Sequence, residues 1–376
     1  MKKKIFAGLT RAEFMRQHWQ KNPLVALNAL PEYAKAIGRA ELIALAQRED
    51  VESRIVRKAG REWHLKNGPF TRRDFSRLPR SGWTLLVQGV EQTLWKGARL
   101  LREFAFIPYA RLDDLMVSYA APGGGVGPHF DSYDVFLLQG KGERRWKFSR
   151  QRDLELVPDA PVKILKNFEP EQESVLGRGD LLYLPPSWAH DGVALTECIT
   201  YSIGFRAPSE QELGSRFLEF LQDKLELNGM YADPDLRATQ TPGRIPPAML
   251  ARFGSMLRGV RWSNGDIAEF TGRYLTEPKA NVVFMRPRRA LKSEDFLKQI
   301  VRDGLTLGLR TRVLAYGAYI FINGEAHRCD VRAHRLLAKL ADQRQLTPPF
   351  NADTEVQHLL YEWYRAGYIE IGVRDG

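Results

Sequence analysis

Two histidines and one aspartate stand at a spacing that could hold a metal ion. A single residue separates His129 from Asp131, so on a β-strand both side chains would lie on the same face. His190 directly follows the run Gly179–Ala189, in which an apolar stretch stops at two prolines. Two histidines and one carboxylate fill three positions of an octahedron and leave three open, which is typical of non-haem Fe(II) oxygenases. The short pair alone could arise by chance, and the longer run before His190 makes the pattern more specific.

Arg144 is the candidate partner for the co-substrate of such an oxygenase. The open metal positions would take the two oxygens of a 2-oxo acid and then dioxygen, and 2-oxoglutarate also has a distal carboxylate that needs a cation. Arg144 lies one predicted hairpin after His129. Its planar guanidinium can bind a carboxylate through two hydrogen bonds, whereas its neighbour Arg145 should point to the opposite face of the strand. These residues predict an oxygenase that uses Fe(II), 2-oxoglutarate and O2.

Short strands are expected to position these side chains. Apolar runs separated by glycine and proline predict a β-sandwich or barrel. The runs are Trp83–Val87, Leu115–Tyr119, Val135–Leu138, Arg145–Phe148, Leu181–Leu184 and Ile199–Phe205. The residues before about 70 are predicted to be helical, with a capping box at Thr10–Glu13 and a second helix at Arg39–Gln47.

The remainder of the chain predicts helices and a small mixed unit. Apolar residues recur at helical spacing over Leu213–Leu225, after a capping box at Ser209–Glu212. A connection rich in Pro, Asp and Gly spans Asp233–Pro247, and more helix is expected after it. Further on, a strand enters an Asn-Gly turn at 323–324, and helices are predicted at 331–340 and 354–366. The expected domains are therefore 1–207, 208–300 and 301–376.

Several of these segments resemble a known family, the bacterial ribosomal oxygenases of the JmjC/cupin type, which hydroxylate an arginine of a large-subunit ribosomal protein. The segments that carry the resemblance are His18–Leu24, Leu112–Met116, Pro122–Asp131, Tyr133–Phe136, Arg144–Trp146, Tyr201–Pro208 and Tyr231–Asp235. The resemblance therefore extends over most of residues 10–250. The resemblance implies an α+β fold with a double-stranded β-helix core, helical N-terminal decoration, a helical dimerisation segment and a C-terminal winged-helix-like domain.

The resemblance also implies roles for single residues. The two histidines and Asp131 would be the iron ligands, and Arg144 would bind the tail of 2-oxoglutarate. Thr200 and Ser202 share a face of the strand after His190, and one of them would help to orient the oxo acid.

A protein arginine as substrate requires acidic and aromatic side chains to bind it. Asp114 shares a strand face with Met116, and both are candidate substrate-binding residues together with Tyr133. A carboxylate can pair with a guanidinium and an aromatic ring can cover its aliphatic stem. For each residue, a capped turn or a surface pair explains the pattern equally well.

Composition limits the partners of the chain. The 376 residues are 44% apolar, which is enough for more than one core, and the net charge is +11 with a pI near 9.6. This excess of positive charge is consistent with contact to ribosomal RNA or with a solvated basic face. Two cysteines, Cys198 and Cys329, cannot form a disulfide framework, and no apolar run is long enough to span a membrane. We therefore expect a cytoplasmic enzyme. The resemblance, together with the apolar helix predicted at Leu213–Leu225, implies that it forms a homodimer.

Two other functions stay open at this stage. The same metal residues would serve a JmjC-type histidine hydroxylase or lysine demethylase, because the triad does not select a substrate. Alternatively, the pI and the basic helix predicted at Val331–Leu340 fit a winged-helix regulator that binds nucleic acid and merely carries a cupin domain.

Overall fold

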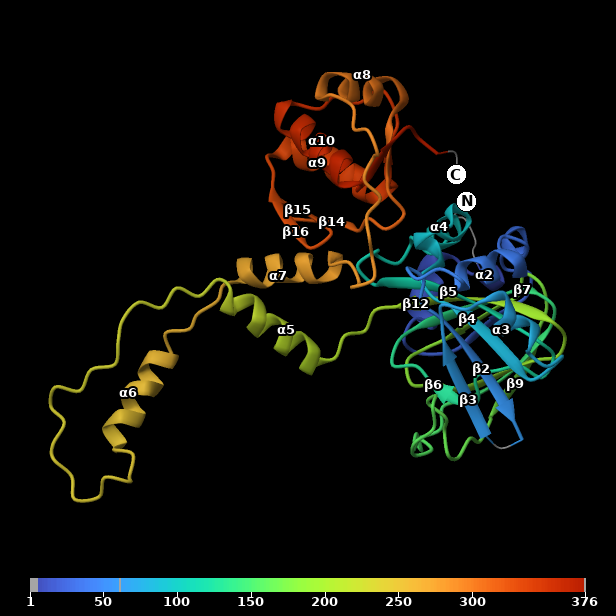
Figure 1. Ribbon diagram of the computed structural model, residues 1–376, viewed down its shortest axis with the longest axis horizontal. Coiled ribbons are helices and arrows are strands. Elements are labelled where there is room, and N and C mark those ends of the chain that lie inside the picture. Colours follow the sequence, from blue (N-terminus) through green and yellow to red (C-terminus); the bar gives the residue numbers. More distant parts are fainter. Residues whose placement is uncertain (1–5, 61, 375–376) are drawn as a thin grey trace. The chain divides into compact units, whose positions relative to one another are not determined.

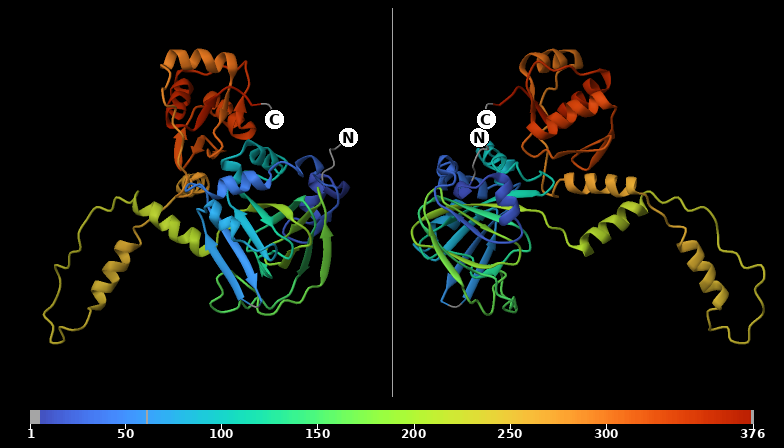
Figure 2. Two further views of the ribbon diagram at one scale, coloured as in Figure 1. Left: turned by 45° about the vertical axis from the view of Figure 1, so that its right-hand side comes forward. Right: turned by 180° about the vertical axis from the view of Figure 1, so that it is seen from behind.

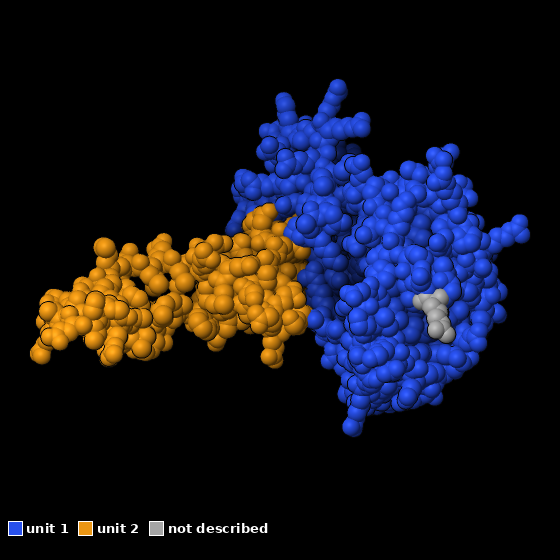
Figure 3. Space-filling view, turned by 60° about the horizontal axis from the view of Figure 1, so that its bottom comes forward, with its two compact units in different colours: residues 1–207, 278–312, 339–376 blue, residues 208–277, 313–338 orange. Residues whose placement is uncertain are grey.

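The computed structural model describes residues 6–60 and 62–374 (Figure 1). The chain divides into two compact units made of non-consecutive segments (Figure 3). The first comprises residues 1–207, 278–312 and 339–376, and the second comprises residues 208–277 and 313–338. The predicted division into 1–207, 208–300 and 301–376 stays a prediction. None of the described helices combines the length and apolarity needed to cross a bilayer.

The N-terminal part of the first unit is partly helical and partly strand. Helix α1 (Arg11–Gln17) begins at the predicted capping box, in which the Thr10 and Glu13 side chains each accept a hydrogen bond from the other residue's backbone N–H. Helix α2 (Arg39–Ala46) also lies where it was predicted. The other elements here are β1 (Leu24–Ala26), α3 (Arg72–Ser76), α4 (Trp95–Arg102) and the 3-10 turns η1 (Phe6–Gly8), η2 (Pro31–Tyr33) and η3 (Val90–Gln92).

The expectation of helix up to residue 70 is wrong at β1 and again over residues 53–67. Strands β2 (Ser53–Ala59) and β3 (Glu62–Asn67) form an antiparallel hairpin there. Along β3 the half-buried residues Trp63 and Leu65 alternate with exposed polar ones, which is the period of a strand at the edge of a sheet. Because this alternation is short and highly charged, it gives only a weak strand signal in the sequence.

All six predicted strands are present, and two sheets face each other in a double-stranded β-helix (Figure 2). The larger sheet has the order β1-β10-β7-β12-β5-β4-β2-β3 and the smaller one β6-β11-β8-β9. In the larger sheet, the remaining strands are β4 (Trp83–Val87), β5 (Leu112–Ala120), β7 (Val135–Lys141), β10 (Leu181–Leu184) and β12 (Cys198–Phe205). The smaller sheet consists of β6 (His129–Phe130), β8 (Arg144–Ser149), β9 (Gln172–Leu176) and β11 (Ala189–Ala194).

The larger sheet is apolar on both faces because each face has its own cover. On β7, Phe136 and Leu138 belong to the core shared with the N-terminal helices, whereas Val135 and Leu137 belong to the core between the two sheets. The second core also contains Trp146 and other side chains of the smaller sheet. A strand that is buried on both faces reads as a continuous apolar run rather than as an alternating one, as β7 does in the sequence.

The second unit is built on two helices and a small sheet. Helices α5 (Glu210–Gln222) and α7 (Asn264–Thr276) pack through aromatic rings, with Phe217 and Phe270 centroids 5.2 Å apart. Helix α6 (Pro247–Leu257) lies in the long excursion between them (Figure 1). Strands β14 (Val313–Tyr316), β15 (Tyr319–Ile322) and β16 (Glu325–Arg328) form the sheet. The predicted Asn323-Gly324 turn joins β15 to β16, with a positive φ at both residues.

The C-terminal elements complete the first unit. Helix α9 (Val331–Gln343) crosses the division between the units, and α10 (Thr354–Ala366) has the predicted bounds. The remaining elements are α8 (Ser293–Asp303), β13 (Leu305–Leu307), β17 (Gln345–Leu346) and β18 (Ile369–Ile371), and the three strands form a sheet in the order β17-β13-β18.

Candidate metal and oxo-acid site

Strand pairing in the smaller sheet brings the two histidines together. His129 on β6 is directly opposite His190 on β11, and opposite residues of an antiparallel pair share a face. Their ring centroids are 4.2 Å apart. The possible ligand atoms of His129, Asp131 and His190 all lie within 4.8 Å of one another, and His190 Nε2 is 3.9 Å from an Asp131 oxygen. The structure therefore gathers all three residues that the sequence singled out.

Both imidazoles are held so that the same nitrogen is free for a metal. Nδ1 of His129 lies 2.9 Å from the carbonyl oxygen of Gly127, and Nδ1 of His190 lies 2.9 Å from that of Trp188. A carbonyl can only accept, so each Nδ1 carries the proton and each Nε2 keeps its lone pair. Burial and then the neighbouring His129 lower the pKa of His190 to about 4, so its ring is neutral at pH 7.

The double proline before His190 also fixes Asp131. Strand β6 ends at Phe130, so Asp131 lies just beyond the strand rather than on it. Its carbonyl accepts a 2.7 Å hydrogen bond from the backbone N–H of Ser187, which follows the two prolines and has a φ of 64°. The turn that delivers His190 therefore also positions the carboxylate-bearing residue.

Arg144 is a buried cation without enough partners. It lies on β8, which pairs with the His190 strand, and only 4% of it is exposed. Nη1 donates to the carbonyl oxygen of Gly192 over 3.2 Å, and the guanidinium carbon lies 5.5 Å from the Trp146 ring centroid. Nε and Nη2 are buried and have no hydrogen-bond partner among the described residues. Because an unpaired buried charge is costly, these atoms suit an anion inside the β-helix, as the distal carboxylate of 2-oxoglutarate would be.

Thr200 and Ser202 both lie on the inner face of β12, but their surroundings differ. The hydroxyl of Thr200 is buried and donates to Gln139 Oε1 over 2.9 Å. Ser202 is half-buried and is paired with Met116 on β5. Thr200 is thus already engaged by the fold, which leaves Ser202 as the better candidate of the two for the oxo acid.

The candidate substrate residues are also close to one another. A Cβ added to Gly204 would lie 3.6 Å from Asp114 Oδ1 and 3.7 Å from Tyr133 Cε2, so both side chains border the same glycine. Burial, and then the charge of Asp131, raise the pKa of Tyr133, which keeps its hydroxyl protonated. Tyr133 therefore connects the candidate metal residues to Asp114.

Three residues around Asp114 were not foreseen from the sequence. Gln88 donates to Asp114 Oδ2, and Lys279 Nζ lies 3.8 Å from the same oxygen. Buried Glu91 accepts the backbone N–H of Leu115 over 2.9 Å, and burial followed by the charge of Asp114 raises the pKa of Glu91 to about 7. No local pattern could reveal them, because Lys279 is far from Asp114 in the chain. Gln88 and Lys279 thus hold one carboxylate oxygen of Asp114, while the other borders Gly204.

Two family models match separate parts of the chain. Residues 99–213 match the JmjC domain, and residues 259–370 match the ROXA-like winged helix. The first span includes every candidate site residue named in the sequence, and the second confirms the winged-helix-like domain. The fold and the site thus define a JmjC-type oxygenase with a C-terminal winged helix.

Relatives and solved structures show which family of JmjC-type oxygenases the chain is similar to. The ribosomal protein uL16 3-hydroxylase of Escherichia coli K12 is 34% identical over 321 residues, which are 83% of this chain and 84% of the relative. A probable ribosomal oxygenase of Haemophilus influenzae is 39% identical over 62% of this chain and 56% of its own length. The structure of the E. coli ribosomal oxygenase YcfD with cobalt and 2-oxoglutarate is similar with a TM-score of 0.83 and 29% identity, over 98% of this chain and 99% of that one. The chain belongs to the bacterial ribosomal oxygenases.

Proposed function

We propose that this protein is an Fe(II)- and 2-oxoglutarate-dependent hydroxylase of an arginine side chain in ribosomal protein uL16. Membership of the ribosomal oxygenases supports this function, and the E. coli relative is named for the same reaction type and substrate. The observation in the structure that carries the proposal is Arg144, whose buried and unpartnered nitrogens lie on the strand next to His190. A structural arginine would be expected to satisfy these atoms within the fold.

The metal would be held by the Nε2 atoms of His129 and His190 and by the Asp131 carboxylate. This donor set fits Fe(II) and leaves room for a bidentate oxo acid. When bound, iron with 2-oxoglutarate and O2 supplies the oxidising power for C–H hydroxylation, and the oxo acid becomes succinate and carbon dioxide. Arg144 would bind the distal carboxylate, and Ser202 or Thr200 would orient the oxo acid. The apolar core between the sheets, which includes Trp146, would keep water from this end of the site.

The substrate arginine would be gripped by Asp114, Tyr133 and Met116. The free oxygen of Asp114 would accept hydrogen bonds from the guanidinium, while the ring of Tyr133 and the flexible side chain of Met116 would cover the aliphatic stem. Gln88 and Lys279 support this role, because they orient the carboxylate from its other side. We also propose that the enzyme is cytoplasmic, because its substrate would be a ribosomal protein.

We further propose that the protein is a homodimer, joined through the segment between α5 and α7. This segment carries many exposed apolar side chains, whereas the surfaces of monomeric proteins rarely expose large apolar patches. They are Leu227, Met230, Leu236, Ile245, Leu250, Leu257 and Trp262. Light scattering at micromolar concentration should give the mass of two chains, and the double variant Leu250→Asp with Leu257→Asp should give the mass of one. A wild-type monomer would contradict the proposal.

Turnover with a uL16 fragment tests the proposed function. With Fe(II), 2-oxoglutarate and O2, we expect succinate to form and one arginine of the fragment to gain the mass of an oxygen atom. Asp131→Ala and His190→Ala should abolish both products, while a fragment with lysine in place of that arginine should not be modified. If the wild type modified a histidine, or removed methyl groups from a lysine, the family would stand and the substrate assignment would be wrong.

A further inference from the structure

The positive charge of the chain is concentrated in one short segment. Residues 53–80 contain nine lysines and arginines and two acids, so these 28 residues account for seven of the eleven net positive charges. This segment comprises β2, β3 and α3. An evenly spread charge would indicate only a solvated surface, whereas this concentration forms a defined electrostatic feature.

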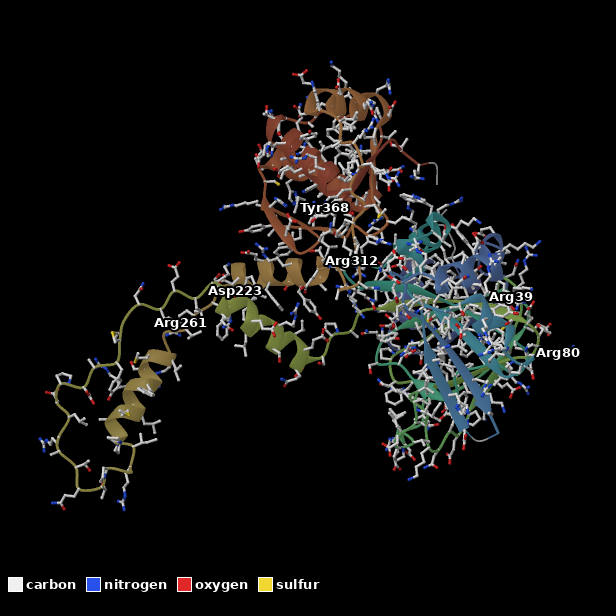
Figure 4. The ribbon with its side chains drawn as sticks, viewed as in Figure 1. Arg39, Arg80, Asp223, Arg261, Arg312 and Tyr368 are labelled. Carbon is white, nitrogen blue, oxygen red and sulfur yellow. The ribbon has the colours of Figure 1, made fainter. Side chains whose placement is uncertain are left out.

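Strand pairing places Arg57 and Lys66 on one face of the hairpin, whereas Arg54 and Lys58 lie on the other. Arg57 is paired with His64 and Ile55 with Lys66, so Arg57 and Lys66 point to the same side of the hairpin. Lys66 also forms an ion pair with Asp74 of α3, which places the short helix on that side. Arg72, Arg73, Arg77 and Arg80 follow on or directly after α3 and are all exposed; Figure 4 labels Arg80 at the outer boundary of the barrel.

The two acids do little to offset this charge. Asp74 is occupied by Lys66 and by the backbone N–H of Thr71, and these hydrogen bonds hold the pKa of Asp74 well below its usual range. Glu62 lies 3.8 Å from His64. The arginines of α3 and Arg80 are therefore left as the dominant charges of the surface.

This surface borders the segment that orients the metal site. On the opposite face of β3, a Cβ added to Gly127 would lie 2.7 Å from Trp63 Cζ2, so the hairpin packs directly on Gly127. The carbonyl oxygen of Gly127 accepts a hydrogen bond from Nδ1 of His129. Lys58 lies over the Trp63 ring at 5.3 Å and adds a cation on this side. The hairpin that carries these cations therefore also packs on the residue whose carbonyl orients His129.

We propose that this basic hairpin surface binds the phosphate backbone of RNA. It consists of Arg57, Lys66, Arg72, Arg73, Arg77 and Arg80. Arginine matches phosphate through its planar fork, and such contacts position a nucleic acid without reading its sequence. No large apolar side chain is exposed among the described residues of 53–80, which disfavours a membrane surface. That the RNA is ribosomal rests on the proposed function, whereas the binding surface itself does not.

Binding of a labelled 30-nucleotide RNA hairpin tests the proposal. The triple variant Arg72→Glu, Arg73→Glu, Arg77→Glu is compared with a control in which Arg150, Arg152 and Lys163, three exposed cations of the same unit, are changed to Glu. At low salt we expect the hairpin variant to lose about tenfold or more in affinity and the control about twofold. The slope of log affinity against log salt should fall by about two to three units in the hairpin variant only.

The following outcomes support or overturn RNA binding by this surface. Equal losses in both variants would mean that net charge alone attracts RNA and would overturn the proposal, as would an unchanged affinity of the hairpin variant. Loss of binding to phosphatidylserine vesicles with unchanged RNA binding would assign the surface to a membrane instead. The neutral triple variant with Gln should lie between wild type and Glu, which separates charge from misfolding. The measurement needs no metal or 2-oxoglutarate, and turnover of a short uL16 peptide should be unchanged, so failure here is distinct from failure of the proposed function.

Discussion

Replacing Arg144 with methionine should stabilise the empty enzyme while it weakens the binding of 2-oxoglutarate. The apolar stem is kept and the buried charge is removed. An incompletely paired buried ion costs several kcal/mol, and its removal sacrifices one hydrogen bond to Gly192 and a contact with Trp146, worth about 1 kcal/mol each. The net gain is about 1–2 kcal/mol in the free energy of unfolding, or about 2–6 °C in Tm for a unit of this size.

The same substitution should weaken the binding of 2-oxoglutarate, although it stabilises the empty protein. Nε and Nη2 of Arg144 would donate two hydrogen bonds to a carboxylate, and their loss should cost about 3–4 kcal/mol, or about 100- to 1000-fold in affinity. Thermal unfolding with Mn²⁺, with and without 2-oxoglutarate, measures both effects in one experiment. The wild type should gain stability from the acid and the variant should not, because the gain depends on ligand concentration relative to Kd.

A matched control is available on the same strand. Arg145→Met makes the same chemical change on the neighbouring residue, whose side chain points away from Arg144, and it should leave the 2-oxoglutarate effect intact. If Arg144→Met were less stable than the wild type without the acid, and still gained the full increment with it, the assignment of Arg144 would be wrong.

Further predictions concern the surroundings of the site. The folded-state pKa of Glu91 is raised, so stability should fall as pH rises from about 4.5 to about 7; denaturant unfolding of Glu91→Gln should show a smaller fall, and an identical pH profile would contradict this. Lys279→Met should raise the KM for the uL16 fragment about tenfold without changing 2-oxoglutarate affinity, since it removes the cation beside Asp114; an unchanged KM would exclude that support. Gly127→Ala should lower stability by about 2–4 kcal/mol in urea unfolding, because Gly127 has a φ of 83° and its Cβ would meet Trp63; wild-type stability would refute the packing.

Local patterns predicted the parts of the fold that are locally determined. Strands with continuous apolar runs, such as β4 and β10, have the predicted bounds because burial on both faces leaves no other reading. The residues His129, Asp131 and His190 could be found because each lies in a short motif with its own turn chemistry. The prediction failed at β2 and β3, a highly charged hairpin in which β3 is at the edge of the sheet and alternates charged residues with few apolar ones.

The surroundings of Asp114 could not be predicted in the same way. Burial raises the pKa of Asp114, and the partners that oppose this shift are brought near only by the fold, among them Lys279 after α7 and Gln88 after β4. Likewise, the sequence placed Arg144 on a strand but could not show that two of its nitrogens lack partners. Such features depend on contacts between residues that are distant in the sequence, and local patterns do not reveal those contacts.

The visible absorption of the anaerobic Fe(II) protein on addition of 2-oxoglutarate tests the central claim most directly. Chelation of Fe(II) by a 2-oxo acid gives a charge-transfer band, so the band reports the metal residues and the acid together. We predict that the wild type forms it, that Asp131→Ala and His190→Ala do not, and that Arg144→Met requires about 100-fold or more 2-oxoglutarate. A wild-type protein without the band, or a His190→Ala variant with the full band, would contradict the assignment of this site.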